Sequence, residues 1–182
     1  MEIVKIYPPY IYSAFYNSAI ENEFDLLFGN WNDVKFVMDF LTENKEWLST
    51  SFWKRFSEPE DAARQILDEA QGLEELFETL YENTVDGSKP DFDDHFKYLG
   101  GKYKYELEYQ PMKSYGQGRP SLLRIYAIKL SNNLYVITGG GIKLADTIQN
   151  SPDLKEHVLR NINEVRSYLR ENGIIDHEDM EV

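Results

Sequence analysis

The sequence predicts an α+β fold, a small antiparallel sheet with helices packed on it. Between residues 33 and 82, apolar residues recur every three or four positions, which is typical of amphipathic helices. From about residue 103 to residue 139, apolar and polar residues alternate over short segments, which is typical of half-buried strands. Aromatic residues make up 14% of the chain, so we expect an aromatic-rich core between these elements.

The first part of the chain is predicted to contain one strand followed by helices. Residues 10–16, YIYSAFY, are aromatic and favour a strand. A short helix is expected at 21–28. A longer helix is expected at 33–48, with Asn32 as its N-cap.

The clearest helix is predicted at 58–82. Ser57-Glu58-Pro59-Glu60 combines an N-cap serine, an early proline and a capping-box glutamate ahead of a long apolar stripe. The opposite side of this helix carries Glu60, Asp61, Asp68, Glu69, Glu74, Glu75, Glu78 and Glu82. Such an acidic side is usually a solvated face, and the alternative is a surface that docks on a basic partner.

Three strands are predicted in succession, at 103–109, 121–130 and 134–139. Residues 111–120, PMKSYGQGRP, are rich in Pro and Gly and are expected to connect the first two strands. Asn132-Asn133 suits a tight hairpin between the last two, because asparagine tolerates a positive φ.

A last helix is predicted at 152–172, opened by Pro152 and ended by Gly173. The element order is then β-α-α-β-β-β-α, with neither an internal repeat nor an interdomain linker. We therefore expect one domain over 1–182. Its first part, 10–90, holds a strand and acidic helices, and its second part, 97–172, holds a basic three-stranded sheet and the C-terminal helix.

Composition narrows the class of protein. The chain has no cysteine, which excludes disulfides, thiolate metal sites and a cysteine nucleophile. Its start, MEIVKIYPPY, lacks the apolar core of a secretory signal. No stretch approaches the roughly 18–20 apolar residues of a membrane helix. We therefore expect a cytoplasmic protein with no membrane partner.

Charge is distributed unevenly along the chain. The net charge is −13, which disfavours a general attraction to nucleic acid. Residues 1–96 hold 7 Lys/Arg and 21 Asp/Glu, whereas residues 97–143 hold 8 and 2. A local basic face can attract phosphate even when the net charge of the protein is negative. The simpler explanation is that the uneven distribution of charged residues arose by chance.

Several kinds of site are disfavoured. His95, His157 and His177 are scattered, without the spacing of a metal site, so neither a metal nor another cofactor is expected. There is no GxSxG motif of a serine hydrolase. The run Gly139-Gly140-Gly141 does not fit a Walker A loop. It favours a bend or close backbone packing, and a small-molecule phosphate site there stays as an alternative.

Arg124 is the most informative charged residue. It shares one face of its predicted strand with Tyr126, among apolar neighbours. Burying an unpaired charge costs several kcal/mol, so Arg124 needs a partner. That partner is either a carboxylate such as Glu106 or a bound phosphate, which the guanidinium fork suits.

Further basic and aromatic residues are expected near Arg124. Lys113, Tyr115 and Arg119 lie just before its strand, and Lys143 follows the next strand. A short hairpin would bring them to one end of the sheet. We predict that the cations Lys113, Arg119, Arg124 and Lys143 share one phosphate-sized site, although loop lysines are usually only solvated.

Residues 96–170 carry a resemblance to a known family. The segment FKYLGGKYKYELEY…SLLRIYAIKLSNNLYVITGGGIKLADTIQNSPDL…INEVRSYL resembles the C-terminal half of RelE/ParE/HigB-type toxins. Those proteins have a "pL…yElR" strand, a "yRi.y" strand, a strand ending near a glycine or aromatic and lysines, and a Pro-led helix. Over 10–82 only the strand-helix-helix order is similar.

The resemblance implies a RelE-like fold and a metal-independent mRNA endonuclease, ribosome-dependent or free, with an antitoxin protein as partner. It places Arg124 and Lys143 where family cations stabilise phosphate charge. It makes Tyr126, Tyr115 and Lys113 candidates for proton transfer or base stacking. The chain departs from the family in being larger and acidic, and in having Leu144 where a second lysine is expected.

Two main functions follow from the sequence. The first is a toxin-like RNA endonuclease, or a descendant of one. The second is a non-catalytic interaction domain that docks a basic partner through the acidic helix 58–82. The oligomeric state is not predicted.

Overall fold

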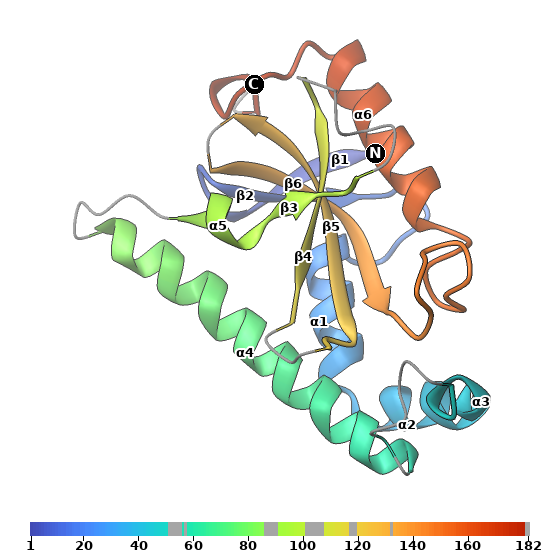
Figure 1. Cartoon of the computed structure of the whole chain (residues 1–182). Coiled ribbons are helices and arrows are strands. Elements are labelled where there is room, and N and C mark those ends of the chain that lie inside the picture. Colours follow the sequence, from blue (N-terminus) through green and yellow to red (C-terminus); the bar gives the residue numbers. More distant parts are fainter. Residues whose placement is uncertain are drawn as a thin grey trace.

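A six-stranded mixed sheet forms the middle of the fold (Figure 1). The structure is a computed structural model that describes residues 1–50, 56, 58–85, 91–100, 108–116, 120–131 and 133–180. In spatial order the strands are β1 (Glu2–Tyr7), β2 (Ile11–Phe15), β6 (Leu134–Ile142), β5 (Leu123–Ser131), β4 (Gln110–Tyr115) and β3 (Lys97–Tyr98). Neighbouring strands are antiparallel, except that β2 and β6 are parallel.

Six α-helices are formed by the described residues. They are α1 (Glu23–Asn32), α2 (Val34–Glu43), α3 (Lys45–Leu48), α4 (Pro59–Val85), α5 (Phe92–His95) and α6 (Val158–Glu171), followed by the 3₁₀ turn η2 (Glu178–Met180). The chain is therefore α+β, as the change of hydrophobic period predicts. The part of the chain that the structure describes has no helix long and apolar enough to cross a membrane.

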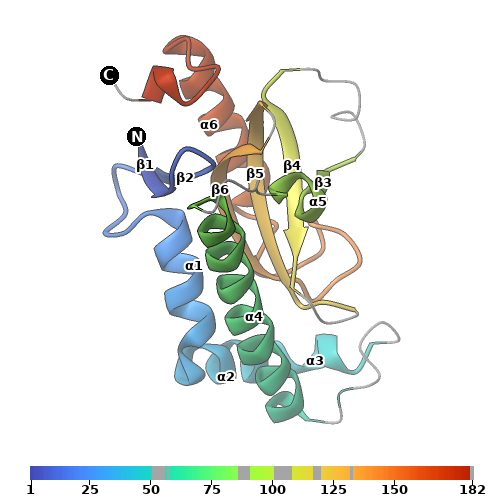
Figure 2. The same cartoon turned by 90° about the vertical axis from the view of Figure 1, so that its left-hand side faces the viewer.

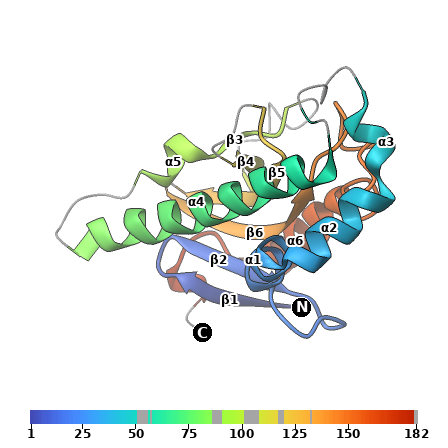
Figure 3. The same cartoon turned by 90° about the horizontal axis from the view of Figure 1, so that it is seen from below.

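The helices pack in two groups. Residues of α1, α2 and α4 share one hydrophobic cluster with Leu123, Ile125 and Ala127 of β5. Residues of α6 share a second cluster with Tyr126 and Ile128, on the opposite face of β5. In Figure 1, α4 and α6 accordingly lie on opposite sides of the molecule, and Figure 3 shows α4 running across the strands.

Capping side chains decide where the first helices begin. Asn22 accepts a hydrogen bond from the backbone N–H of Asp25 at 3.1 Å and starts α1. Asp33 accepts from Lys35 and Phe36 and starts α2. The predicted helix 33–48 with Asn32 as its cap was therefore wrong in detail. Asn32 ends α1, Asp33 is the cap, and 33–48 is divided into α2 and α3 (Figure 2).

The strands differ from the prediction at two places. β1 was not predicted, and β4 lies in the Pro/Gly-rich segment that was expected to be a connection. Pro111 fits in β4 because its carbonyl accepts from Leu99 at 3.0 Å, although proline has no N–H to donate. Most of the predicted strand 103–109 lies outside the described residues. Tyr109 has a positive φ of 51° and precedes β4.

The sheet is mixed rather than wholly antiparallel. β5 occupies one edge of β6, and Ile11 to Ser13 of β2 pair in parallel with Tyr135 to Ile137 on the other edge. This pairing buries Ile11 and Tyr12 on the two opposite faces of the sheet. Burial on both faces stabilises the parallel pairing of β2 with β6. No local pattern in the sequence specifies that these two strands pair.

The last helix begins later than predicted. Residues 152–157 form turns, and α6 starts at Val158. The carboxylate of Asp153 accepts a hydrogen bond from the backbone N–H of Ile142 at 2.7 Å, which holds these turns against β6. Gly173 ends the helix as predicted, with a φ of +66°, and the N–H of Ile174 reaches the carbonyl of Leu169.

Candidate functional site

A cavity of about 630 Å³ lies beside α6, between the sheet and the turn at 146–149. Five of the six predicted site residues line it, namely Lys113, Tyr115, Arg124, Tyr126 and Lys143. We call this cavity the basic pocket. The sixth predicted residue, Arg119, lies outside the described residues.

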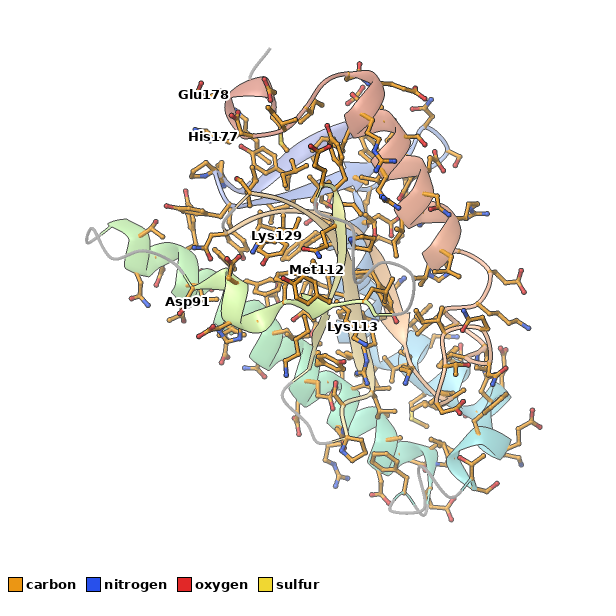
Figure 4. All side chains as sticks on the ribbon, turned by 45° about the horizontal axis from the view of Figure 1, so that its top comes forward. Asp91, Met112, Lys113, Lys129, His177 and Glu178 are labelled. Atoms are coloured by element: carbon orange, nitrogen blue, oxygen red, sulfur yellow. The ribbon has the colours of Figure 1, made fainter. Side chains whose placement is uncertain are left out.

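Strand pairing explains how residues from three segments meet in the basic pocket. In the β4–β5 register, Lys113 is opposite Tyr126 and Tyr115 is opposite Arg124. Because side chains alternate along a strand, these four residues share one face. Met112, next to Lys113 in β4, packs on the other face, in the cluster with α4 (Figure 4). Lys143 enters from the end of β6.

Arg124 is buried, with only 7% of its surface exposed. Its Nη1 donates to the carbonyls of Ser121 at 3.0 Å and Leu123 at 2.6 Å. Its guanidinium carbon lies 4.2 Å from the centre of the Tyr115 ring, a cation–π contact. Burial lowers the pKa of Arg124, against the opposing effects of Tyr126, Tyr115 and Glu69.

The alternative partner for Arg124 was Glu106, which lies outside the described residues. Within the described ranges no carboxylate forms a salt bridge with Arg124. Its hydrogen bonds go to neutral carbonyls, so its positive charge is held in place without being neutralised by an ion pair there. This arrangement suits a site for an anion.

Glu69 of α4 organises the segment that holds Arg124. Its carboxylate accepts from the Ser121 hydroxyl at 2.7 Å and from the backbone N–H groups of Leu122 and Leu123, each at 3.0 Å. Two carbonyls of this same segment bind Arg124. The sequence placed Glu69 on a solvated acidic face, which was wrong, since it is only 3% exposed. It is buried because it satisfies the main chain at the start of β5.

Tyr115 gathers cations from three strands. Besides Arg124, the ammonium groups of Lys113 and Lys97 lie 5.7 and 5.9 Å from its ring centre. The sequence reasoning missed Lys97 as a site residue. Its membership of the basic block was visible, but its pairing with Lys113 in the β3–β4 register requires the fold.

Lys143 and Tyr126 differ in protonation chemistry. The ammonium of Lys143 donates to the carbonyl of Asp146 at 2.8 Å. Burial, and then the charges of Arg124 and Lys113, lower the pKa of Lys143. Burial raises the pKa of Tyr126, although Arg124 opposes this effect. Lys143 therefore gives up a proton more readily than an ordinary lysine, and Tyr126 stays a hydrogen-bond donor at neutral pH.

The Tyr126 hydroxyl has no hydrogen-bond partner among the described residues, although the side chain is only 1% exposed. The hydroxyl oxygen opens to the cavity, where an oxygen of a bound anion would accept its hydrogen bond. The described residues contain no group of three or more His, Asp or Glu placed to hold a metal ion.

The three glycines of β6 serve close packing. A Cβ on Gly140 would collide with the carbonyl of Arg124, and one on Gly141 would collide with Asp153 and Leu154. This agrees with the packing interpretation of the glycine run. Gly140 and Gly141 line a second cavity, on the other side of α6 from the basic pocket.

Comparison with known proteins adds no identification. No family model, no curated protein and no solved structure matches this chain. The resemblance to RelE/ParE/HigB-type toxins therefore stays a prediction based on the short motifs of residues 96–170. What the chain does is inferred from its own residues.

Proposed function

We propose that this protein is a metal-independent RNA endonuclease of RelE-like fold, or a descendant of one, and that the basic pocket binds the RNA phosphate. The observation that carries the proposal is the convergence of Arg124, Lys113 and Lys143 with the unbonded hydroxyl of Tyr126 in one cavity. Two cations and a hydroxyl donor match the oxygens of a phosphodiester, and the Lys143 amine, whose pKa is lowered, can face the attacking 2′-OH.

Each residue has a definite role in this proposal. Lys143, whose pKa is lowered by burial, takes the proton of the ribose 2′-OH. The 2′ oxygen then attacks phosphorus, and the bond from phosphorus to the 5′ oxygen breaks. Arg124 and Tyr126 stabilise the charge that develops on the phosphate oxygens. Lys113 supplies the proton to the departing 5′ oxygen.

Tyr115 supports the site without taking part in proton transfer. Its ring is stacked on the Arg124 guanidinium, so it fixes the orientation of that group. Leu144 stands where the family pattern has a second lysine. It is an apolar side chain and is fully buried, so this position supplies no charge to the site. A descendant that binds RNA but cleaves it slowly is consistent with that replacement. Ribosome-bound or free mRNA as substrate, and an antitoxin protein as partner, belong to the same proposal.

Cleavage by the purified protein tests this function. RNA is incubated with the protein, with and without ribosomes and chelator, and its fragments are separated by size. We expect cleavage that the chelator does not change. Arg124→Ala should slow it about 10²–10³-fold, by analogy with the loss of one oxyanion donor. Lys143→Ala should slow it about 10²–10⁴-fold, the usual contribution of a general base. Lys155→Ala, an exposed lysine remote in sequence from these strands, is the matched control.

Growth after induction provides the second measurement. An endonuclease should arrest growth and shorten cellular mRNA, and both effects should be lost with Arg124→Ala. Intact RNA in the assay together with normal growth on induction would refute the enzymatic proposal. Cleavage that the chelator abolishes would refute its mechanism.

A second function is supported by the acidic side of α4. Asp68, Glu75, Glu78 and Glu82 are exposed, and no salt bridge to them occurs within the described residues. Their unneutralised charge would favour a basic protein surface. Under this proposal, charge reversal on α4 abolishes partner binding, and Arg124→Ala has no effect.

A further inference from the structure

A second cavity, of about 720 Å³, lies on the flank of α6 opposite the basic pocket. Its walls come from α1, α6 and the Gly140–Gly141 part of β6. His157, Asn161 and Glu164 border it, whereas Leu159 and Asn163 of the same helix region border the basic pocket. We call it the Glu23 pocket, after its most deeply placed charged group.

The Glu23 pocket exists because β2 ends before β6 does. β2 pairs with β6 only as far as Ile137, so none of the described strands lies beside the rest of that edge of β6. Side chains take the place of a strand there. The carbonyl of Thr138 accepts from the Tyr16 hydroxyl at 3.0 Å and from Asn161 Nδ2 at 3.2 Å. The carbonyl of Gly140 lies 3.0 Å from His157 Nε2.

Glu23 is the exception in this otherwise well-bonded region. It is only 9% exposed, yet its carboxylate makes no hydrogen bond and no salt bridge with any described residue. The carboxylate lies over Gly139, where an added Cβ would be 3.0 Å from Oε2. The carboxylate opens to the cavity. A largely buried carboxylate without donors from the described residues is costly, so this position points to a ligand that supplies them.

The charges around Glu23 indicate what that ligand carries. Arg160 and Glu164 of α6 are exposed at the mouth of the cavity, and Tyr16 faces it from the end of β2. Asp153 and His157 complete the titratable lining. Three carboxylates face one guanidinium and one imidazole, which favours a cation over an anion.

Part of the lining is apolar. It is formed by Leu27 and Trp31 of α1 and by Phe36 of α2, which is 37% exposed at the rim. A carboxylate at one end and aromatic rings at the other suit an amphipathic molecule. The volume lies within the range of roughly 300–1,000 Å³ that is common for small-molecule sites.

We propose that the Glu23 pocket binds a small organic cation, a protonated amine or a guanidinium on an apolar or aromatic body, with the Glu23 carboxylate as its counter-ion. The N–H groups of the cation supply the donors that the protein does not. The apolar body packs on Leu27, Trp31 and Phe36. This site is independent of the basic pocket and of RNA cleavage.

Binding should be linked to the protonation of Glu23. Burial raises the pKa of Glu23 to about 7, against the effect of Arg160. A cation binds only the ionised carboxylate, so affinity should rise up to about tenfold per pH unit below the pKa and level off above it. Asp153, His157 and Glu164 border the same cavity, so a Glu23 variant is needed to separate its contribution from theirs.

The test uses matched pairs of probes with the full chain. Phenethylamine and benzylguanidine are compared with their neutral analogue phenylethanol by NMR, at probe concentrations up to about 10 mM, the weak end of small-ligand affinity. We expect the two cations, and not the alcohol, to shift the Trp31 indole and the Gly140 and Gly141 amide signals. Absence of shifts with both cations, or equal shifts with the alcohol, would overturn the proposal.

Two variants complete the test. Glu23→Gln keeps the shape of the side chain and should weaken cation binding at least about tenfold and remove its pH dependence. Glu21→Gln, at an exposed acidic residue close by in sequence, should bind as the unmodified protein does. Thermal melting is used to check that both variants are folded. Unchanged binding by Glu23→Gln, or a persisting pH dependence, would overturn the role of Glu23. RNA cleavage should be unchanged in Glu23→Gln, so the two proposals fail separately.

Discussion

The basic pocket and the Glu23 pocket border the same helix and the same strand, yet they hold their buried charges differently. In the basic pocket, two carbonyls and the Tyr115 ring hold the Arg124 guanidinium. In the Glu23 pocket, no described residue donates to the carboxylate. The edge of β6 explains the difference. Strands β5 and β4 back the first pocket, whereas no strand in the described part of the chain continues beside the second.

The comparison shows two ways of placing a charge inside a protein. A guanidinium that the main chain already orients can meet an anion without rearrangement, which suits stabilisation of a transition state. An unbonded carboxylate changes its protonation with pH and with its ligand. We therefore expect the basic pocket to respond to loss of its supporting residues, and the Glu23 pocket to respond to pH.

The largest effect is expected from removing the support of Arg124. Glu69→Ala leaves two backbone N–H groups and the Ser121 hydroxyl without an acceptor. Unfolding free energy should fall by about 3 kcal/mol, because several buried donors lose a charged partner. Phosphate binding should weaken together with stability. Asp68→Ala, at the exposed neighbour, should change neither in denaturant unfolding and binding titrations. Equal stability of the two variants would contradict the role of Glu69.

A smaller effect is expected from Glu23, as a change in the free energy of unfolding with pH. The pKa of the Glu23 carboxyl is about 7 in the folded protein, whereas the ordinary pKa of a glutamate is 4.5, so the folded protein holds the Glu23 proton to a higher pH than the unfolded chain does. Stability should therefore fall as pH rises through this window, by at most about 3.5 kcal/mol, since one pKa unit corresponds to about 1.4 kcal/mol.

Glu23→Gln should lack this part of the pH dependence. The measurement is urea unfolding of both proteins at several pH values from about 4.5 to 8. The difference between their stability curves isolates Glu23 from the other titrating groups. Parallel curves would show that Glu23 does not hold its proton in the folded state.

The hydroxyls of two buried tyrosines offer a matched comparison. Tyr126→Phe removes a hydroxyl without a described partner, so RNA affinity or cleavage should fall about five- to tenfold with little change in stability. Tyr135→Phe removes a hydroxyl that donates to Asp93 at 2.7 Å, so it should lose about 1 kcal/mol of stability and leave RNA binding unchanged. RNA-binding titrations and thermal melts distinguish the two results, and the reverse pattern would contradict the assignment of Tyr126.

The smallest effect is expected from Lys97, which contacts the Tyr115 ring without lining the basic pocket. Lys97→Ala should weaken RNA binding about two- to threefold. It should also reduce the slope of log affinity against log salt concentration by about 1, the contribution of one phosphate contact. Binding measured over a series of salt concentrations gives this slope. Lys155→Ala should leave the slope unchanged. An unchanged slope in both variants would remove Lys97 from the RNA contact.

Local patterns in the sequence predicted part of the fold and of the site. The period-two alternation placed Arg124 and Tyr126 on one strand face, and β5 has them there. The apolar stripe after Pro59 predicted the start of α4. Gly173 predicted the end of α6. These features depend on residues close in sequence, whose spacing is set by strand and helix geometry.

Tertiary structure decided which residues meet across the chain. Glu69 has the same character in the sequence as the other acids of α4, yet it alone among them is buried, against the start of β5. Glu23 occupies a cavity only because β2 leaves the edge of β6 after Ile137. Lys97 reaches Tyr115 only through the pairing of β3 with β4. A sequence pattern specifies the face on which a side chain lies. The residue that it meets there depends on long-range packing, because no local spacing encodes which elements become neighbours.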